Sequence, residues 1–359
     1  MKITLFINSL YGGGAERVAC NLANYLFRRG HDVEILAMSE TERTYELDTG
    51  IGIKYLLHLN ERKSKKWNTV IRMPRFWSYL LLKHRDVYVV MLPTTTIMLL
   101  MFKWMTRSRV IAAERVDPSV YPEDLAADLR KNARKADGYV FQTEEAMAWY
   151  GNSVQTCCPI VIPNAINEAF IRPRYTGVKR RAIASAGRLN HQKNYPLLLR
   201  AFSRIANEYP DISLIIYGEG EDRQIIEEFS ESLGINKRVS MPGNIQNIAE
   251  EMEKNMLFVL ASDYEGMPNA LMEAMSLGLP CISTDCPCGG PRFLIKDGIN
   301  GLLVPVNNAD AMAEAIKRVL SDDSFAASLA EEARKISESL SASKIYGQWE
   351  KYIMDIVAK

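Results

Sequence analysis

Two glutamates, Glu265 and Glu273, stand eight residues apart around the start of a predicted helix. A buried strand is expected to end at Ser262, a glycine-containing turn follows, and the helix begins near Asn269. The backbone N–H groups of such a helix start, here around Met267–Leu271, can bind phosphate or sugar oxygens. Ionised carboxylates accept hydrogen bonds from vicinal hydroxyls. The segment therefore predicts a polyhydroxyl site, although an acidic pair alone is often only a surface feature.

The cations Arg188 and Lys193 are a second group of residues that could do chemistry. They stand five residues apart in a loop after another predicted strand. Open α/β sheets bind ligands at the carboxyl ends of their strands. Two cations there suit a diphosphate, which an arginine can contact with two parallel hydrogen bonds. The alternative is a solvated loop that carries two charges.

Three consecutive glycines, Gly12 to Gly14, follow the first predicted strand and open the first helix. They allow a ligand to approach the backbone closely, beside the free N–H groups of a helix start. The spacing is not G-x-G-x-x-G, and no acidic residue clearly ends the second strand, which weakens a dinucleotide-binding interpretation. A tight turn without a ligand is the alternative.

These groups need a scaffold, and the sequence alternates short apolar runs with segments of helical period. Most of the short runs are continuously apolar, as parallel strands buried on both faces are. The rhythm predicts an α/β fold of doubly wound parallel sheets. The expected strands are Lys2–Asn8, Asp32–Ala37, Ile53–Leu57, Val87–Leu92, Val110–Ala113, Gly138–Gln142, Ile160–Pro163, Ala182–Gly187, Ile212–Tyr217, Val239–Met241, Met256–Ala261, Cys281–Ser283 and Gly301–Val304.

The rhythm occurs twice, and the polar segment Arg172–Lys179 is expected to link the two halves. This organisation predicts two Rossmann-like domains that face a cleft, residues 1–172 and 180–342. Residues 343–359 form a last helix with one apolar stripe, which we expect to pack back on the first domain. The other expected helices are Glu16–Arg29, Pro196–Glu208, Asp222–Leu233, Ala270–Leu277, Ala309–Ser321 and Phe325–Leu340.

Composition excludes several classes of protein. The 359 residues carry a net charge of +1 and are 47% hydrophobic, which is ordinary for a globular protein and argues against disorder and against a dedicated nucleic-acid binder. Six irregularly spaced cysteines and four scattered histidines favour reduced thiols over a disulfide framework or a zinc site. The N-terminal apolar run is too short for a signal peptide. Residues 87–105 read as a buried strand, a turn at Pro93 and a buried helix, not as a membrane span.

Several motifs together resemble one family over nearly the whole chain. They are Gly13-Gly14-Ala15-Glu16-Arg17, Gly187-Arg188-Leu189 with Gln192-Lys193-Asn194, Tyr217-Gly218-Glu219-Gly220, the Glu265 and Glu273 pair, Thr284-Asp285-Cys286-Pro287 with Gly289-Gly290-Pro291, and Asn300-Gly301-Leu302-Leu303-Val304. With these motifs the chain resembles the retaining glycosyltransferases of family 4, which have the GT-B fold.

The resemblance implies a hexosyltransferase that uses a nucleotide-sugar donor, here expected to be UDP-linked. Arg188 and Lys193 are expected to hold the donor diphosphate and stabilise the leaving group, and Glu265 to contact the transferred sugar. Glu273 is expected to bind the ribose, and Gly13 and Gly14 to let the first loop close over the substrates. No D-x-D motif is present, so neither a metal nor another cofactor is expected. The remaining expected donor contacts are Gly266, Met267, Pro268, Asn269, Ala270 and Leu271.

The chain departs from the family pattern where many members have a histidine near the reacting sugar. The comparable segment here contains Glu114-Arg115. We expect Arg115 to be a cation on the acceptor side, with Glu114 beside it. A structural ion pair is the alternative.

The near-neutral net charge conceals an asymmetry between the two halves. Residues 1–175 hold 24 Lys and Arg against 18 Asp and Glu, and the remainder holds 20 against 25. Basic residues interleaved with aromatic ones suit an anionic bilayer surface, although a solvated helix face is the alternative and RNA binding a weaker one. The expected membrane-surface residues are Lys63, Lys65, Lys66, Trp67, Arg72 and Arg75.

Together these features predict a cytoplasmic enzyme, peripheral on the inner face of the cell membrane. It would extend a polyprenyl-diphosphate-linked glycan with a hexose or N-acetylhexosamine in surface polysaccharide or glycan synthesis. No nucleic-acid partner is expected. The alternatives are another GT-B enzyme, such as a sugar-nucleotide epimerase or a transferase to a soluble acceptor, and a non-catalytic sugar-nucleotide-binding protein.

Overall fold

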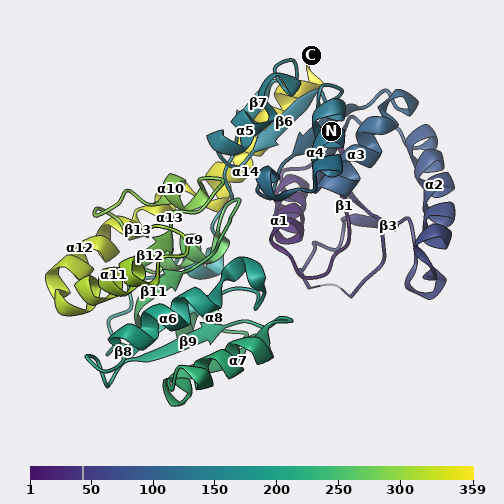
Figure 1. Cartoon of the computed structure of the whole chain (residues 1–359). Coiled ribbons are helices and arrows are strands. Elements are labelled where there is room, and N and C mark those ends of the chain that lie inside the picture. The colour runs from purple at the N-terminus through teal and green to yellow at the C-terminus, as the bar shows by residue number, and fades with distance from the viewer. Residues whose placement is uncertain (43) are drawn as a thin grey trace. The chain divides into compact units, whose positions relative to one another are not determined.

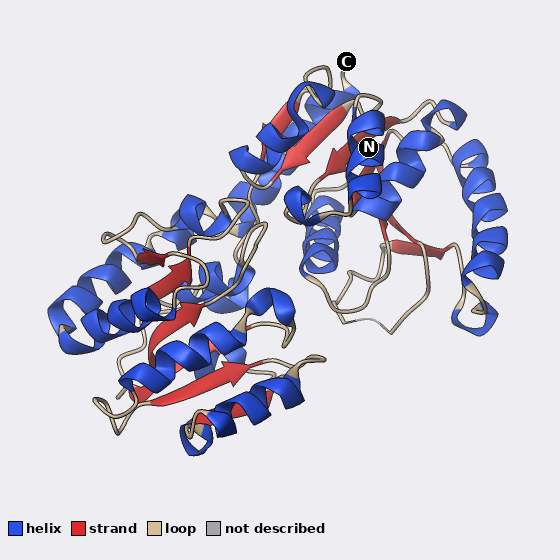
Figure 2. Ribbon diagram, in the orientation of Figure 1, coloured by secondary structure: helices blue, strands red, loops and turns tan. Residues whose placement is uncertain are grey.

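The computed structural model describes residues 1–42 and 44–359, which divide into two compact units (Figure 1). Unit 1 comprises Met1–Ala165 and Ser343–Lys359, and unit 2 comprises Ile166–Ala342. The segment expected to be a linker lies inside unit 2, where Arg172 pairs with Glu250 at 3.4 Å. In both units, helices flank a parallel sheet (Figure 2).

Unit 1 is built on seven parallel strands in the order β3-β2-β1-β4-β5-β6-β7. All five residues of β4 are buried, as a strand covered on both faces requires. The chain leaves β1 toward β2 and later returns to pair β4 with the other side of β1, so the strand order reverses there. The strands are β1 (Lys2–Ile7), β2 (Asp32–Ala37), β3 (Gly52–Tyr55), β4 (Val87–Met91), β5 (Arg109–Ala113), β6 (Gly138–Phe141) and β7 (Pro159–Val161).

The helices of unit 1 include one from the far end of the sequence, α14. Its apolar stripe is buried, and Trp349 is fully inaccessible. The Tyr352 hydroxyl donates to the Cys158 carbonyl at 2.7 Å and accepts from the Tyr139 N–H at 2.9 Å, which fixes α14 beside β6 and β7. The helices are α1 (Gly14–Arg28), α2 (Lys65–Leu82), α3 (Pro93–Met101), α4 (Glu123–Ala133), α5 (Glu144–Tyr150) and α14 (Ala342–Val357).

The segment from β4 to residue 105 differs from its prediction at both ends of its helix. The turn is at Leu92, a non-glycine residue with φ of 82°, and Pro93 is the first residue of α3. The helix buries Leu99 and Leu100, but Met101 is 50% exposed and Trp104, in the following 3-10 turn η2 (Lys103–Met105), is 79% exposed. The end of this apolar run therefore lies on the surface.

Unit 2 contains six parallel strands in the order β10-β9-β8-β11-β12-β13. Here the order reverses at β8, which pairs with β9 on one side and β11 on the other. The strands are β8 (Arg180–Ala186), β9 (Ser213–Tyr217), β10 (Val239–Gly243), β11 (Asn255–Leu260), β12 (Cys281–Thr284) and β13 (Leu302–Val304).

Apolar side chains from the strands and helices of unit 2 form its core, which includes the fully buried Phe202 and Ile316. The predicted helix over residues 325–340 is two helices, α12 and α13, with a break at Lys335. The helices are α6 (Tyr195–Ile205), α7 (Arg223–Ser232), α8 (Ile248–Met252), α9 (Asn269–Ser276), α10 (Gly290–Leu294), α11 (Ala309–Ser321), α12 (Asp323–Arg334) and α13 (Ile336–Ser339).

The structure also bears on two predictions, that the cysteines are reduced thiols and that the apolar segments do not span a membrane. All six cysteines are free, and five of them are buried. Across residues 1–42 and 44–359, no helix combines the length and the apolar character that crossing a bilayer demands.

Candidate active site

The loop after β8 carries the predicted cations of unit 2. Gly187 leaves the strand with φ of 158°, and a Cβ there would lie 2.9 Å from the Lys193 side chain. Asn194 is left-handed (φ 42°), and its side chain accepts from the Leu197 N–H to cap α6. This geometry directs Lys193 back across the end of β8, at the point where the strand order of the sheet reverses.

Lys193 meets Glu265 there. The Lys193 Nζ lies 2.6 Å from Glu265 Oε1, with 15% and 8% of the two side chains exposed. Glu265 follows β11, the neighbour of β8, so two segments about seventy residues apart converge on one edge of the sheet. The structure thus brings together the predicted phosphate-binding cation and the predicted sugar-binding carboxylate.

Two further side chains hold Glu265 in place. The fully buried Ser262 donates its hydroxyl to Glu265 Oε1 at 2.7 Å. Gln192 Nε2 donates to the Tyr264 carbonyl at 2.9 Å and lies 3.4 Å from Glu265 Oε2. Neither Ser262 nor Gln192 was predicted to have this role. The only signals for them were that Gln192 precedes Lys193 and that Ser262 ends a strand.

The negative charge of Glu265 affects the groups around it. Burial, followed by the charge of Glu265, raises the pKa of the Cys286 thiol to about 12. The same two causes, in the same order, raise the pKa of the Tyr195 hydroxyl. Both groups stay neutral at physiological pH, so Lys193 and Glu265 are the charged pair at this edge.

The turn after Glu265 is packed tightly against the loop that follows β12. A Cβ on Gly290 would lie 2.0 Å from the Gly266 carbonyl oxygen and 2.9 Å from Pro268 Cδ. The Glu265 N–H also donates to the Pro287 carbonyl at 2.9 Å. The turn that carries Glu265 is therefore fixed from the neighbouring strand.

Helix α9 starts directly after this turn. The N–H groups of Leu271 and Met272 donate to the Pro268 carbonyl, so the positive end of the helix adjoins Glu265. Met267 is buried, Asn269 and Ala270 are partly exposed, and Glu273 on the second turn is 7% exposed. All the predicted donor residues of this segment thus lie at one edge of unit 2.

Arg188 belongs to the same edge but is arranged differently. Its side chain is exposed, and within the described part of the chain it makes no hydrogen bond or ion pair. It stands after Gly187 in the loop that leaves β8, five residues before Lys193. Arg188 is therefore a free cation beside an already paired one.

The predicted residues of unit 1 are placed as follows. Gly13 is the N-cap of α1 and Gly14 its first residue, after β1. Two N–H groups of this loop are already engaged, because Gly12 donates to Thr44 Oγ1 at 3.0 Å and Gly13 to the Tyr45 hydroxyl at 3.3 Å.

Glu114 and Arg115 are buried at the end of β5, with 3% and 8% exposed. Glu114 accepts from the hydroxyls of Tyr121 and Tyr150 at 2.7 and 2.6 Å, and burial raises its pKa. Arg115 donates to Asn164 at 3.0 Å and stacks on the Trp349 ring, and burial lowers its pKa to about 10. Within the described residues they do not form a direct ion pair with each other.

The predicted membrane-surface residues separate into two groups. Lys63, Lys65, Lys66 and Trp67 are exposed, at the start of α2. By contrast, Arg72 donates to Ser39 at 2.6 Å, and Arg75 forms two hydrogen bonds with Glu61. Arg72 and Arg75 therefore fasten α2 to its own unit.

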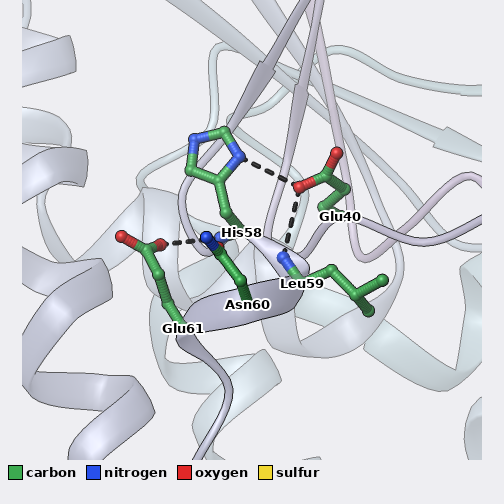
Figure 3. Close-up of a pocket in the computed structure, with 5 residues that line it drawn as sticks. All are labelled: Glu40, His58, Leu59, Asn60 and Glu61. Atoms are coloured by element: carbon green, nitrogen blue, oxygen red, sulfur yellow. Dashed lines mark hydrogen bonds and ion pairs between the residues drawn. The ribbon is translucent and has the colours of Figure 1, made fainter.

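A shallow pocket of about 490 Å³ lies beside this attachment (Figure 3). Glu40 Oε2 accepts from His58 Nδ1 at 3.0 Å and from the Leu59 N–H at 3.1 Å, and Glu61 accepts from the His58 N–H at 2.9 Å. These bonds fix the 3-10 turn η1 (Leu59–Glu61) ahead of α2. Both carboxylates of the pocket thus accept hydrogen bonds from its own lining, which is a structural role.

A metal site was not expected, and the described residues contain no cluster of three or more His, Cys, Asp or Glu side chains that could hold one. That the reaction needs no metal stays a prediction, which an activity assay with and without a chelator would test.

Comparison with known proteins identifies the chain. Residues 168–336 match the family described as glycosyl transferases group 1. The fold matches that of Anabaena Alr3699/HepE, solved in complex with UDP, with a TM-score of 0.84 at 16% identity over 99% of this chain and 100% of that one. The chain is a glycosyltransferase with the GT-B fold.

Two sequence relatives of this glycosyltransferase differ in length. A Campylobacter jejuni protein named GalNAc-alpha-(1->4)-GalNAc-alpha-(1->3)-diNAcBac-PP-undecaprenol alpha-1,4-N-acetyl-D-galactosaminyltransferase is 26% identical over 99% of both chains. The exopolysaccharide phosphotransferase SCO2592 of Streptomyces coelicolor is 28% identical over the whole of this chain, which spans 41% of that protein's length.

Proposed function

We propose that this glycosyltransferase moves a hexose or N-acetylhexosamine from a UDP-sugar to a glycan linked to polyprenyl diphosphate, with retention of anomeric configuration. The observation that carries the proposal is the contact between Lys193 and Glu265 where the strand order of unit 2 reverses. The named specificity of the Campylobacter relative, which matches over nearly its whole length, supports a lipid-linked acceptor.

The two cations have separate tasks in this proposal. Arg188, which is exposed, makes the first contact with the diphosphate. Lys193 is already oriented by Glu265 and stabilises the negative charge that develops on the leaving phosphate. The N–H groups at the start of α9 add positive potential. Protein groups thus supply the stabilisation that a metal would give elsewhere.

The carboxylates recognise the sugar and the nucleoside. Glu265, held by Ser262 and Gln192, presents acceptor oxygens to the hydroxyls of the transferred sugar. Glu273, a buried residue on the second turn of α9, binds the ribose. Loss of Glu265 would therefore weaken binding of the transferred sugar, whereas loss of Glu273 would weaken binding of the ribose.

A lipid-linked acceptor requires access to a membrane surface. We propose peripheral binding to the cytoplasmic face of the cell membrane, with Lys63, Lys65, Lys66 and Trp67 as contact residues. Lys63 already lies 5.1 Å from the centroid of the Trp67 ring, which places a cation beside an interfacial aromatic side chain. Glu114 and Arg115 position the end of β5 on the acceptor side.

The test measures UDP release from a panel of UDP-sugars, with and without a detergent-solubilised undecaprenyl-diphosphate-linked glycan. We expect acceptor-dependent UDP release that Lys193→Ala lowers about 10²–10³-fold, as loss of one transition-state contact does. Lys296→Ala removes an exposed lysine elsewhere in unit 2 and should leave the rate unchanged.

Other outcomes would replace this proposal. Release of UMP would indicate transfer of a phosphosugar, and an isomerised sugar nucleotide would indicate an epimerase. Tight UDP binding without turnover would indicate a binding protein. Full activity of both Lys193→Ala and Glu265→Gln would show that the site lies elsewhere.

A further inference from the structure

A second pocket of unit 1 lies at the opposite edge of its sheet from the loops described above. It occupies about 390 Å³ where the chain enters β4 and β5, and we call it the β4–β5 pocket. Its lining comes from residues 80, 81 and 83–86, from residues 105–109 and from Val357 of α14. Because the strands are parallel, their amino ends here are remote from the carboxyl ends that carry Gly13 and Arg115.

The lining of the β4–β5 pocket is strongly basic. Two of its arginines are already paired, Arg85 with Asp32 at 3.4 Å and Arg109 with Asp137 at 3.2 Å. Lys83, His84 and Arg107 also line it, and among the residues that the structure describes their side chains make no hydrogen bond or ion pair. The one acidic lining residue, Asp86, accepts a hydrogen bond from the Lys2 N–H.

A buried donor adds to these open charges. The Arg85 side chain is 6% exposed, and its Nε–H has no hydrogen-bond partner in the described structure. Unpartnered buried donors are costly, and the exposed guanidinium of Arg107, which also lines the pocket, is suited to two-point contact with a phosphate. The pocket therefore favours an anion with several acceptor oxygens.

Apolar side chains surround the same pocket. Leu81, which lines it, is 58% exposed, and its neighbour Leu82 is 78% exposed. Met105 lines the pocket from η2, and Trp104 beside it is 79% exposed. An exposed tryptophan and two exposed leucines beside open cations form an unusual surface for a protein in water.

This apolar surface continues along the outer side of α2. The exposed apolar residues of α2 recur at intervals of three and four, so they lie on one stripe of the helix. No acidic residue occurs between Glu61 and Asp86. The stripe consists of Trp67, Val70, Pro74, Trp77 and Leu81.

We propose that the β4–β5 pocket binds the headgroup phosphate of an anionic phospholipid, while Leu81, Leu82 and Trp104 enter the interface of the bilayer. Lys83 and Arg107 contact the phosphate oxygens. Tryptophan prefers the headgroup region, and leucine the acyl chains below it. The inference rests on the proposed membrane association and adds a specific lipid site at the end of α2 away from Lys63.

Vesicle sedimentation tests the site. The wild type, Lys83→Ala/Arg107→Ala and the charge-matched control Lys237→Ala/Lys296→Ala are mixed with vesicles of phosphatidylcholine, alone or with an equal amount of phosphatidylglycerol. The control lysines are exposed residues of unit 2. We expect the pocket variant to bind the mixed vesicles about 30-fold more weakly, since each basic residue near an anionic surface contributes about 1 kcal/mol. The control should bind like the wild type.

A second variant and a soluble competitor distinguish the sources of phosphate. Trp104→Ala should weaken vesicle binding without altering the affinity for glycerol phosphate. Equal vesicle binding by the wild type and the pocket variant would overturn the inference. So would glycerol phosphate binding that depends on Lys83 and Arg107 in a protein that does not sediment with vesicles, because the site would then serve a soluble anion.

Failure here is separable from failure of the proposed activity. The pocket variant should retain wild-type turnover with the detergent-solubilised acceptor, because the β4–β5 pocket lies far from the carboxyl ends of the strands. Loss of vesicle binding with retained turnover therefore supports the lipid site. Absence of acceptor-dependent turnover in the wild type would refute the transferase proposal, whatever the vesicles show.

Discussion

Gly290→Ala should slow the enzyme strongly from a position outside the predicted substrate contacts. The added methyl would lie 2.0 Å from the Gly266 carbonyl oxygen, whereas even tight contacts of a Cβ are 3.0 Å or longer. One of the two loops must therefore move by about 1 Å. A backbone carbonyl cannot rotate aside as a long side chain can, and Gly266 adjoins Glu265 directly.

The size of the effect follows from that displacement. Overpacking of this kind costs about 1–3 kcal/mol of stability. Misplacing a catalytic group by about 1 Å lowers the rate about 10²-fold. We therefore expect a folded protein that melts at a lower temperature and turns over about 10²-fold more slowly, as measured by thermal unfolding and UDP release.

Gly347→Ala is the matched control. Glycine 347 lies within α14, where the same methyl would be 3.6 Å from the Tyr25 hydroxyl, an ordinary contact. Alanine is the better helix former by about 1 kcal/mol, so this variant should be at least as stable as the wild type. Wild-type melting and turnover in Gly290→Ala would refute the idea that the two loops of unit 2 hold Glu265 in place.

Three other variants test separate parts of the structure. Ser262→Ala removes a hydrogen bond to a carboxylate, so we expect turnover to fall about 10-fold while UDP affinity, measured by calorimetry, is unchanged, which a general loss of folding would not produce. Tyr352→Phe leaves the buried Tyr139 N–H without an acceptor and should cost about 1–3 kcal/mol in urea unfolding. The pKa of Glu61 is lowered from 4.5 to about 2, chiefly by its arginine partner, so the pairing stabilises the fold above about pH 4.5 and is lost as the pH falls toward 2. Glu61→Gln should flatten the acid unfolding curve over that range, and an unchanged curve would contradict the pairing.

The strands were predictable because most of them are nearly continuous in apolar residues. Asp32–Ala37 was predicted to the residue, and most of the others to within one or two residues. Helix ends were harder to place: the predicted single helix over 325–340 breaks at Lys335, where no proline or glycine signals it. Hydrophobic periodicity shows which face of a helix is buried. In this segment the same face stays buried on both sides of the break, so the periodicity gave no sign of it.

The charged residues of the candidate active site could be predicted from the sequence, but the residues that hold them in place could not. Lys193 and Glu265 stand in recognisable motifs, whereas the bond from Ser262 depends on how residues 262 to 265 turn after β11. The exposure of Trp104 was missed for a related reason. An apolar run indicates burial on average, and only the packing of α3 shows that its last residues extend beyond the core.

The place of α14 has a consequence for how the chain folds during its synthesis. Unit 2 is continuous in sequence, but unit 1 needs a helix that is translated after all of unit 2. Residues 166–342 are therefore synthesised while the groups that receive Trp349 and Tyr352 are still uncovered. Unit 1, which emerges first, is the last to be completed, and its exposed apolar surface must be protected for the whole interval.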